Sequence, residues 1–230
     1  MMKIFVPQLN GNPFAHALGK IVCVGRNYAA HAAELNNPIP TAPILFMKPA
    51  SAACDLAQPL RIPCDRGSVH HETELAILIG APLRDADTAQ ARAAIAGIGI
   101  ALDLTLRDVQ DKLKKEGQPW ERAKAFDGAY PVSPFVAMKN IATEPVDLQN
   151  LMLQLYRNGN LQQDGNTAQM LFSVIDLMVE ISKIFSLQPG DIVSTGTPAG
   201  VGPLSSGDKL IAMLGAKEPG DLLRVETRVL

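Results

Sequence analysis

The sequence predicts an α+β fold that is mainly β, a rolled or sandwiched β core with helices at its periphery. Segments with strand character outnumber helical ones, and they mostly follow one another directly with Gly/Pro turns between them. A doubly wound sheet would instead alternate strands with helices. No internal repeat or Ser/Gly-rich linker divides the 230 residues. We therefore expect one main domain over residues 19–230, preceded by a small N-terminal segment over residues 1–18.

The composition argues against several classes of protein. Lys and Arg number 21 and Asp and Glu 23, a net charge of −2, and no basic stripe is interleaved with aromatics, so nucleic acid is not an expected partner. No apolar run reaches the length of about 18 residues that a membrane span needs, and the N-terminus lacks a signal-peptide pattern. The three cysteines form no CxxC pair, which indicates neither a disulfide framework nor a zinc site. We expect a soluble protein of the cytoplasm.

The first predicted helix covers residues 29–37, "AAHAAELNN", and follows the strand and turn "IVCVGRNY". Alanines and Glu34 favour a helix, and Asn-Asn-Pro ends it. His31 and Glu34 lie three residues apart and so share one helix face. Such a pair is either an ordinary surface contact or a histidine base that a carboxylate orients, and the residues alone leave both interpretations open.

An irregular Pro- and Gly-containing loop then leads into the strand "HHETELAILIG", from His70 to Gly80. Strand side chains alternate between faces, so Glu72 and Glu74 share one face. Because both faces turn apolar within a few residues, the strand should be buried on both sides and the two glutamates should point into a pocket. Their backbones would lie about 7 Å apart. Two such anions need a compensating positive charge.

The next two elements are a helix and a second strand. "DADTAQARAAIAG" suits a helix capped by Asp87 or Thr88, and "IGIALDLTL" returns to strand character. Asp103 interrupts the apolar run of this strand. It is the third carboxylate in a setting that should exclude carboxylates.

A further short helix is predicted just after Asp103, in "TLRDVQDKLKKEG". Thr105 and Asp108 have the spacing of a capping box, and Gly117 would end the helix. Arg107 and Gln110 fall on the same side of it.

The rest of the chain predicts a hairpin, a long helix and short strands. "LMLQLYRNGNLQQDG" contains Asn158-Gly159, the pair that a type I′ turn favours. "TAQMLFSVIDLMVEISKIF" predicts an amphipathic helix. Its expected buried stripe contains Met170, Leu171, Val174, Ile175, Met178, Ile181 and Ile184. The later loop "STGTPAGVGP" matches neither a Walker motif nor GxGxxG, but its backbone N–H groups would suit an anion and Thr197 offers a hydroxyl.

Three carboxylates without His or Cys at ligand spacing suggest an all-oxygen site. Such a site suits Mg²⁺, Mn²⁺ or Ca²⁺ rather than zinc, and few protein ligands would leave positions open for substrate. Two alternatives remain open from the residues alone. The glutamates could be solvated at a sheet edge with the aspartate capping the following helix, or the three acids could hold a structural Ca²⁺ in a non-catalytic protein.

Six segments, in this order and spacing, resemble those of the fumarylacetoacetate hydrolase family, and within it the short bacterial members similar to acylpyruvases and fumarylpyruvate hydrolases. The segments are "GRNYAAHAAE", "LFMKPASA", "VHHETELAILIG", "ALDLTLRDVQ", "GQPWERAKAFD" and "GDIVSTGTPAGVGP". The resemblance runs from about Ile21 to Leu230. It implies a mixed β-sandwich roll, a catalytic domain, a homodimer and a Mg²⁺ or Mn²⁺ ion.

The resemblance also implies roles for particular residues. The implied metal ligands are Glu72, Glu74 and Asp103. The implied catalytic group is a lysine beside the metal and a His-Glu pair on a lid-like helix, here Lys124, His31 and Glu34. The implied substrate contacts are Arg107, Gln110 and Thr197.

Residues and resemblance together predict a divalent-metal-dependent hydrolase acting on a small oxo-acid. It would cleave the C–C bond of acylpyruvate-type 1,3-dicarbonyl acids through a metal-stabilised enolate, with Glu34 orienting His31, His31 activating water and Lys124 adding positive charge. The same apparatus would serve an oxaloacetate decarboxylase or tautomerase. It would also serve an isomerase or decarboxylase of the 2-hydroxyhepta-2,4-diene-1,7-dioate type in aromatic catabolism.

Overall fold

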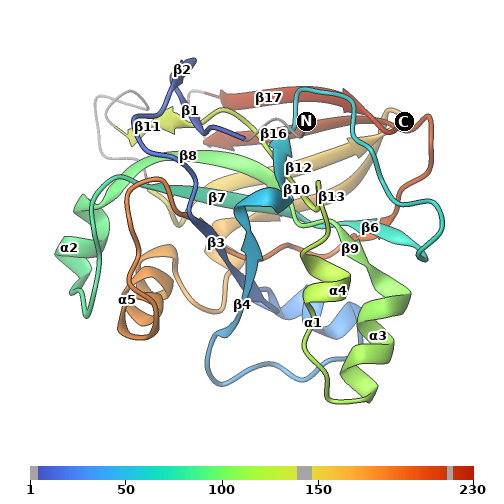
Figure 1. Cartoon of the computed structure of the whole chain (residues 1–230), viewed down its shortest axis with the longest axis horizontal. Coiled ribbons are helices and arrows are strands. Elements are labelled where there is room, and N and C mark those ends of the chain that lie inside the picture. Colours follow the sequence, from blue (N-terminus) through green and yellow to red (C-terminus); the bar gives the residue numbers. More distant parts are fainter. Residues whose placement is uncertain (1–4, 139–146, 217–219) are drawn as a thin grey trace.

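The computed structural model describes residues 5–138, 147–216 and 220–230, so the first four residues of the expected N-terminal segment lie outside the described residues. A mixed sheet of eight strands packs against an antiparallel sheet of four strands (Figure 1). Short helices lie around this body. The prediction of a mainly β fold with a sandwiched core and peripheral helices is confirmed.

The larger sheet contains β3 (Lys20–Gly25), β4 (Ile44–Pro49), β5 (Ala53–Asp55), β7 (Thr73–Ile79), β8 (Ile95–Leu102), β10 (Tyr130–Val132), β11 (Val136–Ala137) and β14 (Ile192–Ser194). Its order is β4-β3-β14-β7-β8-β10-β5, and β11 pairs with β8. The pairs β14–β3 and β10–β5 run parallel, and the other pairs run antiparallel. β7 and β8 therefore lie in the middle of the sheet, where neighbouring strands cover both of their edges.

The smaller sheet contains β12 (Leu151–Arg157), β13 (Asn160–Asn166), β16 (Lys209–Ala216) and β17 (Gly220–Arg228), in the order β13-β12-β16-β17. Asn158 and Gly159 join β12 to β13 with φ values of 53° and 81°. Positive φ at both turn residues is the mark of a type I′ hairpin, as predicted. Two small sheets complete the β structure: β1 (Gln8–Leu9) with β2 (Asn12–Pro13), and β6 (Val69–His71) with β9 (Thr105–Leu106) and β15 (Gly202–Pro203).

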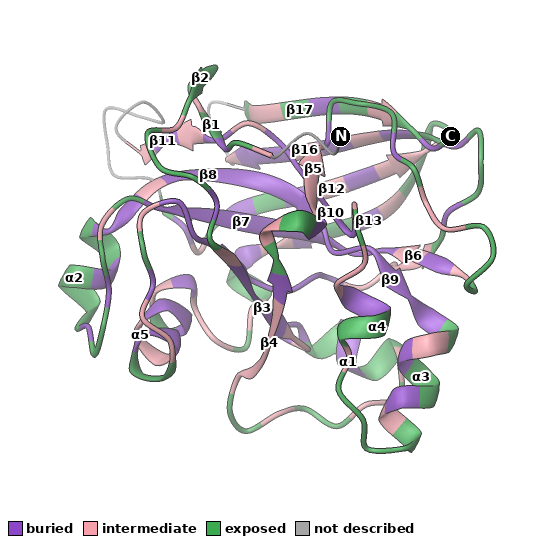
Figure 2. Cartoon of the chain, viewed as in Figure 1, coloured by how far each residue is buried: buried purple, intermediate pink, exposed green. Residues whose placement is uncertain are grey.

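β7 is buried on both faces, as its sequence predicts (Figure 2). Leu75 and Ile77 belong to the core that includes residues of both sheets. Ala76 and Leu78, on the opposite face, belong to a second apolar cluster. Glu74 has the parity of this second face and is therefore held inside the protein.

The helices are α1 (Ala29–Glu34), α2 (Thr88–Ala93), α3 (Arg107–Lys115), α4 (Glu121–Lys124) and α5 (Val174–Ile184). α2 and α5 pack on each other, while α1, α3 and α4 lie together at another part of the molecule (Figure 1). Asp87 caps α2 by accepting the backbone N–H of Gln90, as predicted. Among the described residues, no helix combines the length and apolarity needed to cross a membrane.

The predicted capping box before α3 is wrong. Thr105 still pairs with His70 in a strand, so the residue that precedes the helix is Leu106, and no side chain caps it. The Thr105 hydroxyl donates to the Asp103 carbonyl, and Asp108 accepts the backbone N–H of Ser68. Thr105 pairs in a strand instead of capping the helix, because its place in the fold sets it opposite His70.

The predicted long helix is shorter than its apolar pattern. Ser173 accepts the backbone N–H of Asp176, which starts α5 at Val174. Met170 and Leu171 therefore precede the helix, and Ile184 at its end is 58% exposed. The prediction that Met170, Leu171 and Ile184 belong to the buried stripe of this helix is therefore wrong.

Two strands that the sequence predicts as continuous are each broken at a carboxylate. The first is divided into β6 and β7 with Glu72 between them, and the second into β8 and β9 with Asp103 and Leu104 between them. Thr73 pairs with Leu102, and the N–H of Asp103 donates to the carbonyl of Glu72 at 2.8 Å. The two breaks therefore lie opposite each other.

Candidate active site

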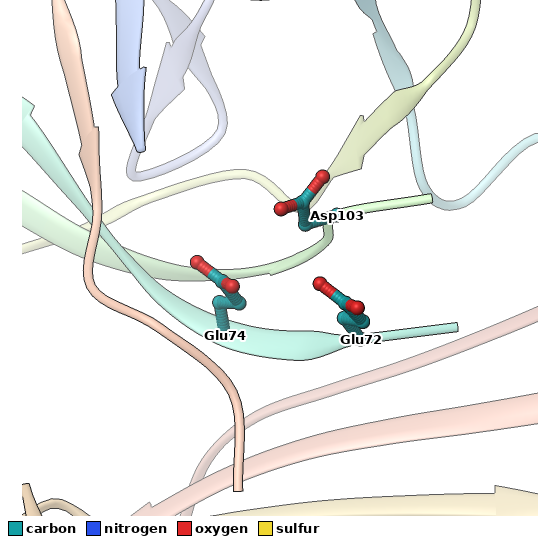
Figure 3. A group of neighbouring side chains, drawn as sticks. All are labelled: Glu72, Glu74 and Asp103. Atoms are coloured by element: carbon teal, nitrogen blue, oxygen red, sulfur yellow. The ribbon is translucent and has the colours of Figure 1, made fainter. Parts of the chain in front are cut away.

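Three buried carboxylates meet at the paired strand breaks (Figure 3). Each of Glu72, Glu74 and Asp103 offers an oxygen, and these oxygens lie within 4.8 Å of one another. Their residues are 5%, 1% and 1% exposed. Glu72 and Asp103 come from the gaps between strands and Glu74 from β7, so main-chain pairing sets the spacing of the three.

Cationic side chains compensate this cluster. Lys124 Nζ lies 2.7 Å from both a Glu72 oxygen and an Asp103 oxygen, and Arg107 forms an ion pair with the other Glu72 oxygen. Lys48 Nζ lies 2.7 Å from Asp103 Oδ1. All three cations are buried. The resemblance implies a lysine beside the metal ligands, and Lys124 lies among the acids.

The pKa values of the two glutamates are shifted in opposite directions. Burial alone would raise the pKa of Glu72, but attraction by Lys124 and Arg107 outweighs burial and holds this pKa well below its usual range. Burial raises the pKa of Glu74 to about 8, and repulsion by Asp103 adds to the effect. Burial would lower the pKa of Lys124, but Asp103 and Glu72 reverse this and raise it.

The Glu74 carboxylate is held from the other side by the neighbouring strand. It accepts hydrogen bonds from the Ser194 hydroxyl, 2.5 Å away, and from the Gly196 backbone N–H at 2.9 Å. Ser194 ends β14, and Ala76 of β7 pairs with it. The start of the loop that follows β14 is thereby attached to the acidic cluster.

Lys48 is the most important residue that sequence reasoning did not assign. It is fully buried in β4, and its ammonium donates to the carbonyls of Lys124, Ala129 and Leu104 as well as pairing with Asp103. The sign of a buried lysine in the sequence is its position inside the apolar segment "ILFMKP". A buried lysine of this kind needs acceptors, and these come from segments 56 to 81 residues away.

α1 brings the predicted His-Glu pair to the same pocket. His31 Nδ1 lies 3.4 Å from a Glu34 oxygen, and the Gly200 backbone N–H donates to both Glu34 oxygens at 3.1 and 3.2 Å. Because the carboxylate is an acceptor, Nδ1 carries the hydrogen of the neutral ring and Nε2 is unprotonated. Burial lowers the pKa of His31, although Glu72 and Glu34 partly oppose this.

The pocket is open to solvent, and the empty space within it and at its mouth is about 390 Å³. Its walls include the acidic cluster, His31, Lys124 and the three side chains matched to substrate contacts, which are Arg107, Gln110 and Thr197. Arg107 donates to Gln110 at 2.6 Å, so these two residues do share one side of α3. Arg26, Lys114 and Trp120 also line it and were not expected. Arg26 has a φ of 58°, but nothing in the sequence alone marks it.

The acidic cluster fits a hard divalent cation. It offers only oxygen donors, which Mg²⁺ and Mn²⁺ prefer. Burial and, after it, repulsion by Asp103 raise the pKa of Glu74, and a cation between the three acids would relieve that repulsion. The first of the two alternatives therefore does not describe this site, since the glutamates are not solvated and Asp103 does not cap α3.

Comparison with known proteins places these features in a family. A model described as the fumarylacetoacetate (FAA) hydrolase C-terminal family matches residues 20–230. The oxaloacetate tautomerase of Escherichia coli strain K12 is 55% identical over 195 residues, which cover 85% of this chain and 88% of that protein.

Two solved structures also resemble the chain along its length. A candidate fumarylacetoacetate isomerase/hydrolase from Oleispira antarctica is 55% identical with a TM-score of 0.93 and covers 100% of both chains. The fumarylpyruvate hydrolase of Pseudomonas aeruginosa, in complex with Mn²⁺ and pyruvate, is 31% identical with a TM-score of 0.89 and covers 100% of this chain and 97% of its own. The chain is a member of the fumarylacetoacetate hydrolase family of enzymes.

Proposed function

We propose that the chain interconverts the enol and keto forms of oxaloacetate, a small dicarboxylic oxo-acid. The acylpyruvate hydrolase expected from the sequence becomes the second candidate. Two findings support this order. The oxaloacetate tautomerase of Escherichia coli is 55% identical, whereas the fumarylpyruvate hydrolase is 31% identical. Four cationic side chains, Arg26, Arg107, Lys114 and Lys124, also line the pocket, which suits a diacid.

The charge of the pocket is the observation that carries the proposal. Lys48, Lys124 and Arg107 form direct ion pairs with Glu72 and Asp103, so three formal positive charges stand against the three formal negative charges of the acidic cluster. A divalent cation would add two positive charges, and a dianion such as oxaloacetate would neutralise them. Arg26 and Lys114 line the same pocket and increase its attraction for an anion.

Glu72, Glu74 and Asp103 would hold a Mg²⁺ or Mn²⁺ ion, which when bound supplies Lewis-acid polarisation of a substrate carbonyl. The protein's own cations act beside it. Lys124 and Arg107 present buried N–H groups that stabilise negative charge as it develops on substrate oxygen. Neither group has to leave water during the reaction, because both are already desolvated.

His31 is the proposed proton carrier. Glu34 accepts the Nδ1 hydrogen, so Nε2 is the nitrogen that takes up a proton. Since burial lowers the pKa of His31, the ring is neutral at neutral pH and its Nε2 is free to accept a proton. In the keto-to-enol direction a proton leaves carbon 3 for Nε2, and Nε2 then delivers that proton to the oxygen on carbon 2, which restores the neutral ring; the reverse direction carries it back to carbon 3. The composition of the substrate is unchanged, so no water is consumed and no carbon–carbon bond breaks.

An NMR time course tests the proposal. Oxaloacetate and acetylpyruvate are each incubated with protein and Mg²⁺, and enol, ketone, pyruvate and acetate are followed separately. We expect faster enol–ketone equilibration of oxaloacetate, pyruvate at the uncatalysed rate and no acetate from acetylpyruvate. His31→Asn should remove the acceleration, because the amide cannot act as a base. Catalysed release of pyruvate from oxaloacetate would instead identify a decarboxylase.

Hydrolysis stays as the second candidate because of the His31–Glu34 pair. The same neutral imidazole could deprotonate a water, which would attack the distal carbonyl of an acylpyruvate and release pyruvate and a carboxylic acid. Acetate and pyruvate formed from acetylpyruvate in equal amounts would favour this candidate and overturn the tautomerase.

A further inference from the structure

Gln163 of β13 is a fully buried amide that none of the proposed chemistry uses, yet it connects the smaller sheet to the pocket. Its Oε1 accepts the backbone N–H of Thr73 at 3.0 Å and lies 3.0 Å from His71 Nδ1. Its Nε2 donates to Thr197 Oγ1 at 2.8 Å and to the Pro198 carbonyl at 3.0 Å. All four hydrogen-bonding positions of the amide are filled.

The backbone fixes which way this amide points. The N–H of Thr73 is only a donor, so the atom that it meets must be oxygen. The carbonyl of Pro198 is only an acceptor, so the atom that it meets must be nitrogen. A flipped amide would break both hydrogen bonds inside the protein, where unpaired polar groups are costly. Thr197 Oγ1 is therefore held as an acceptor of the Gln163 N–H.

This contact determines what Thr197 can offer to the pocket. With its oxygen accepting from Gln163, the hydroxyl still has its own hydrogen to donate. The acceptor found for it among the residues that the structure describes is the Pro198 carbonyl at 3.4 Å, which is long for a hydroxyl hydrogen bond. Thr197 lines the pocket together with the acidic cluster. The hydroxyl hydrogen is therefore available to an oxygen of a bound anion.

The loop around Thr197 is packed so closely that it cannot easily adjust. A Cβ on Gly165 of β13 would lie 2.4 Å from Pro198 Cβ. A Cβ on Gly200 would lie 2.0 Å from the backbone oxygen of Gln162. The loop thus lies directly against β13 on both sides of the Gln163 contact. It has little room to shift, so a substitution at Gln163 changes the hydrogen bonding of Thr197.

We propose that Gln163 is a positioning residue that keeps the Thr197 hydroxyl as a hydrogen-bond donor to a carboxylate or enolate oxygen of the substrate. It acts through Thr197 and sets the affinity for the dianion, while the affinity for the metal is set by the acidic cluster. The inference rests on the proposed function only in taking a small dianion as the ligand.

The test measures binding rather than turnover, with oxalate as the dianion and Mn²⁺ as the metal. Gln163→Glu keeps the shape but replaces the amide donor by an acceptor, so the Thr197 hydroxyl turns toward position 163. Thr197→Val removes the hydroxyl at nearly constant shape, and Thr197→Ser retains it. We expect each of the first two variants to weaken oxalate binding about tenfold, the effect of one hydrogen bond to a charged group. Calorimetric Mn²⁺ affinity should stay within about twofold in all of them.

The double variant decides whether Gln163 acts through Thr197. If it does, Gln163→Glu costs no further oxalate affinity once Thr197 is valine. Losses that multiply in the double variant, or an equal loss of Mn²⁺ affinity, would show a general structural role and overturn the proposal. If Gln163→Glu does not fold, unchanged oxalate affinity in Thr197→Val would overturn it, and a loss that Thr197→Ser restores would support it. Because enol–ketone kinetics are measured separately, failure of the tautomerase would not be confused with failure of this inference.

Discussion

At the scale of single residues, Lys48 is expected to be the most sensitive position outside the acidic cluster. Lys48→Met keeps the length of the chain but removes the partner of Asp103 and of the carbonyls around it. Breaking a buried ion pair on one side costs about 3–5 kcal/mol. Urea unfolding in EDTA should show a loss of this size. Lys183→Met, which removes an exposed pair with Glu180, is the matched control and should cost less than about 1 kcal/mol.

His31 gives a prediction about pH and stability. Burial lowers its pKa in the folded protein, so below about pH 6.5 the unfolded chain takes up a proton that the folded chain refuses. The free energy of unfolding therefore falls as the pH is lowered through this value, by up to about 1.4 kcal/mol per pH unit until the folded ring is protonated too.

His31→Asn isolates this effect from those of the other buried groups. Urea unfolding of both proteins at about pH 7.5 and 5.5 should show a larger loss for the wild type than for the variant. Equal losses would mean that the ring is protonated in the folded state at the lower pH. The comparison is needed because Glu74, whose raised pKa makes it bind a proton on folding, changes stability in the opposite direction over the same range.

At the scale of elements, the loop after β14 depends on Gly200. Its φ of 96° and the 2.0 Å approach of a Cβ to the Gln162 carbonyl both exclude a side chain. Gly200→Ala should therefore lower the free energy of unfolding and also move the N–H that holds Glu34. The matched control is Gly207→Ala, which has a similar φ of 91° but no atom within 4 Å of the added Cβ.

The control should show only the cost of the backbone conformation, about 1 kcal/mol. Gly200→Ala should cost at least about 1 kcal/mol more than the control and reduce the rate of enol–ketone exchange, while Gly207→Ala leaves that rate unchanged. Equal costs in the two variants would mean that the loop moves freely away from β13.

The sequence predicts elements well where the signal is local, and poorly where a distant partner decides. The Asn158-Gly159 turn and the Asp87 cap are local, and both predictions are confirmed. Thr105 has the local spacing of a cap but pairs with His70, a choice that only the fold reveals. The same limit applies to the site. Three acids in apolar strands are visible in the sequence, whereas Lys48 is unremarkable until its distant acceptors surround it.

At the scale of the whole molecule, metal removal should separate activity from folding. Lys48, Lys124 and Arg107 already offset the charge of the acidic cluster, and the core of the two sheets is built from apolar side chains that do not bind an ion. Chelation with EDTA should therefore abolish enol–ketone exchange but leave a cooperative thermal transition, and added Mg²⁺ should restore activity. Loss of the cooperative transition on chelation would instead indicate a structural ion.

Because of the paired strand breaks, the acids of the site and the other side chains of the pocket are positioned by different parts of the molecule. Because the N–H of Asp103 donates to the carbonyl of Glu72, main-chain pairing sets where these carboxylates lie, whereas His31, Arg107 and Thr197 come from two helices and a loop. His31 and Thr197 have no hydrogen bond or ion pair with these acids among the described residues, so mutations at these two positions can alter which small molecule is accepted without disturbing the acids at the centre. A fold of this kind can acquire new substrate preferences when residues of the surrounding helices and loop change and the three acids stay the same.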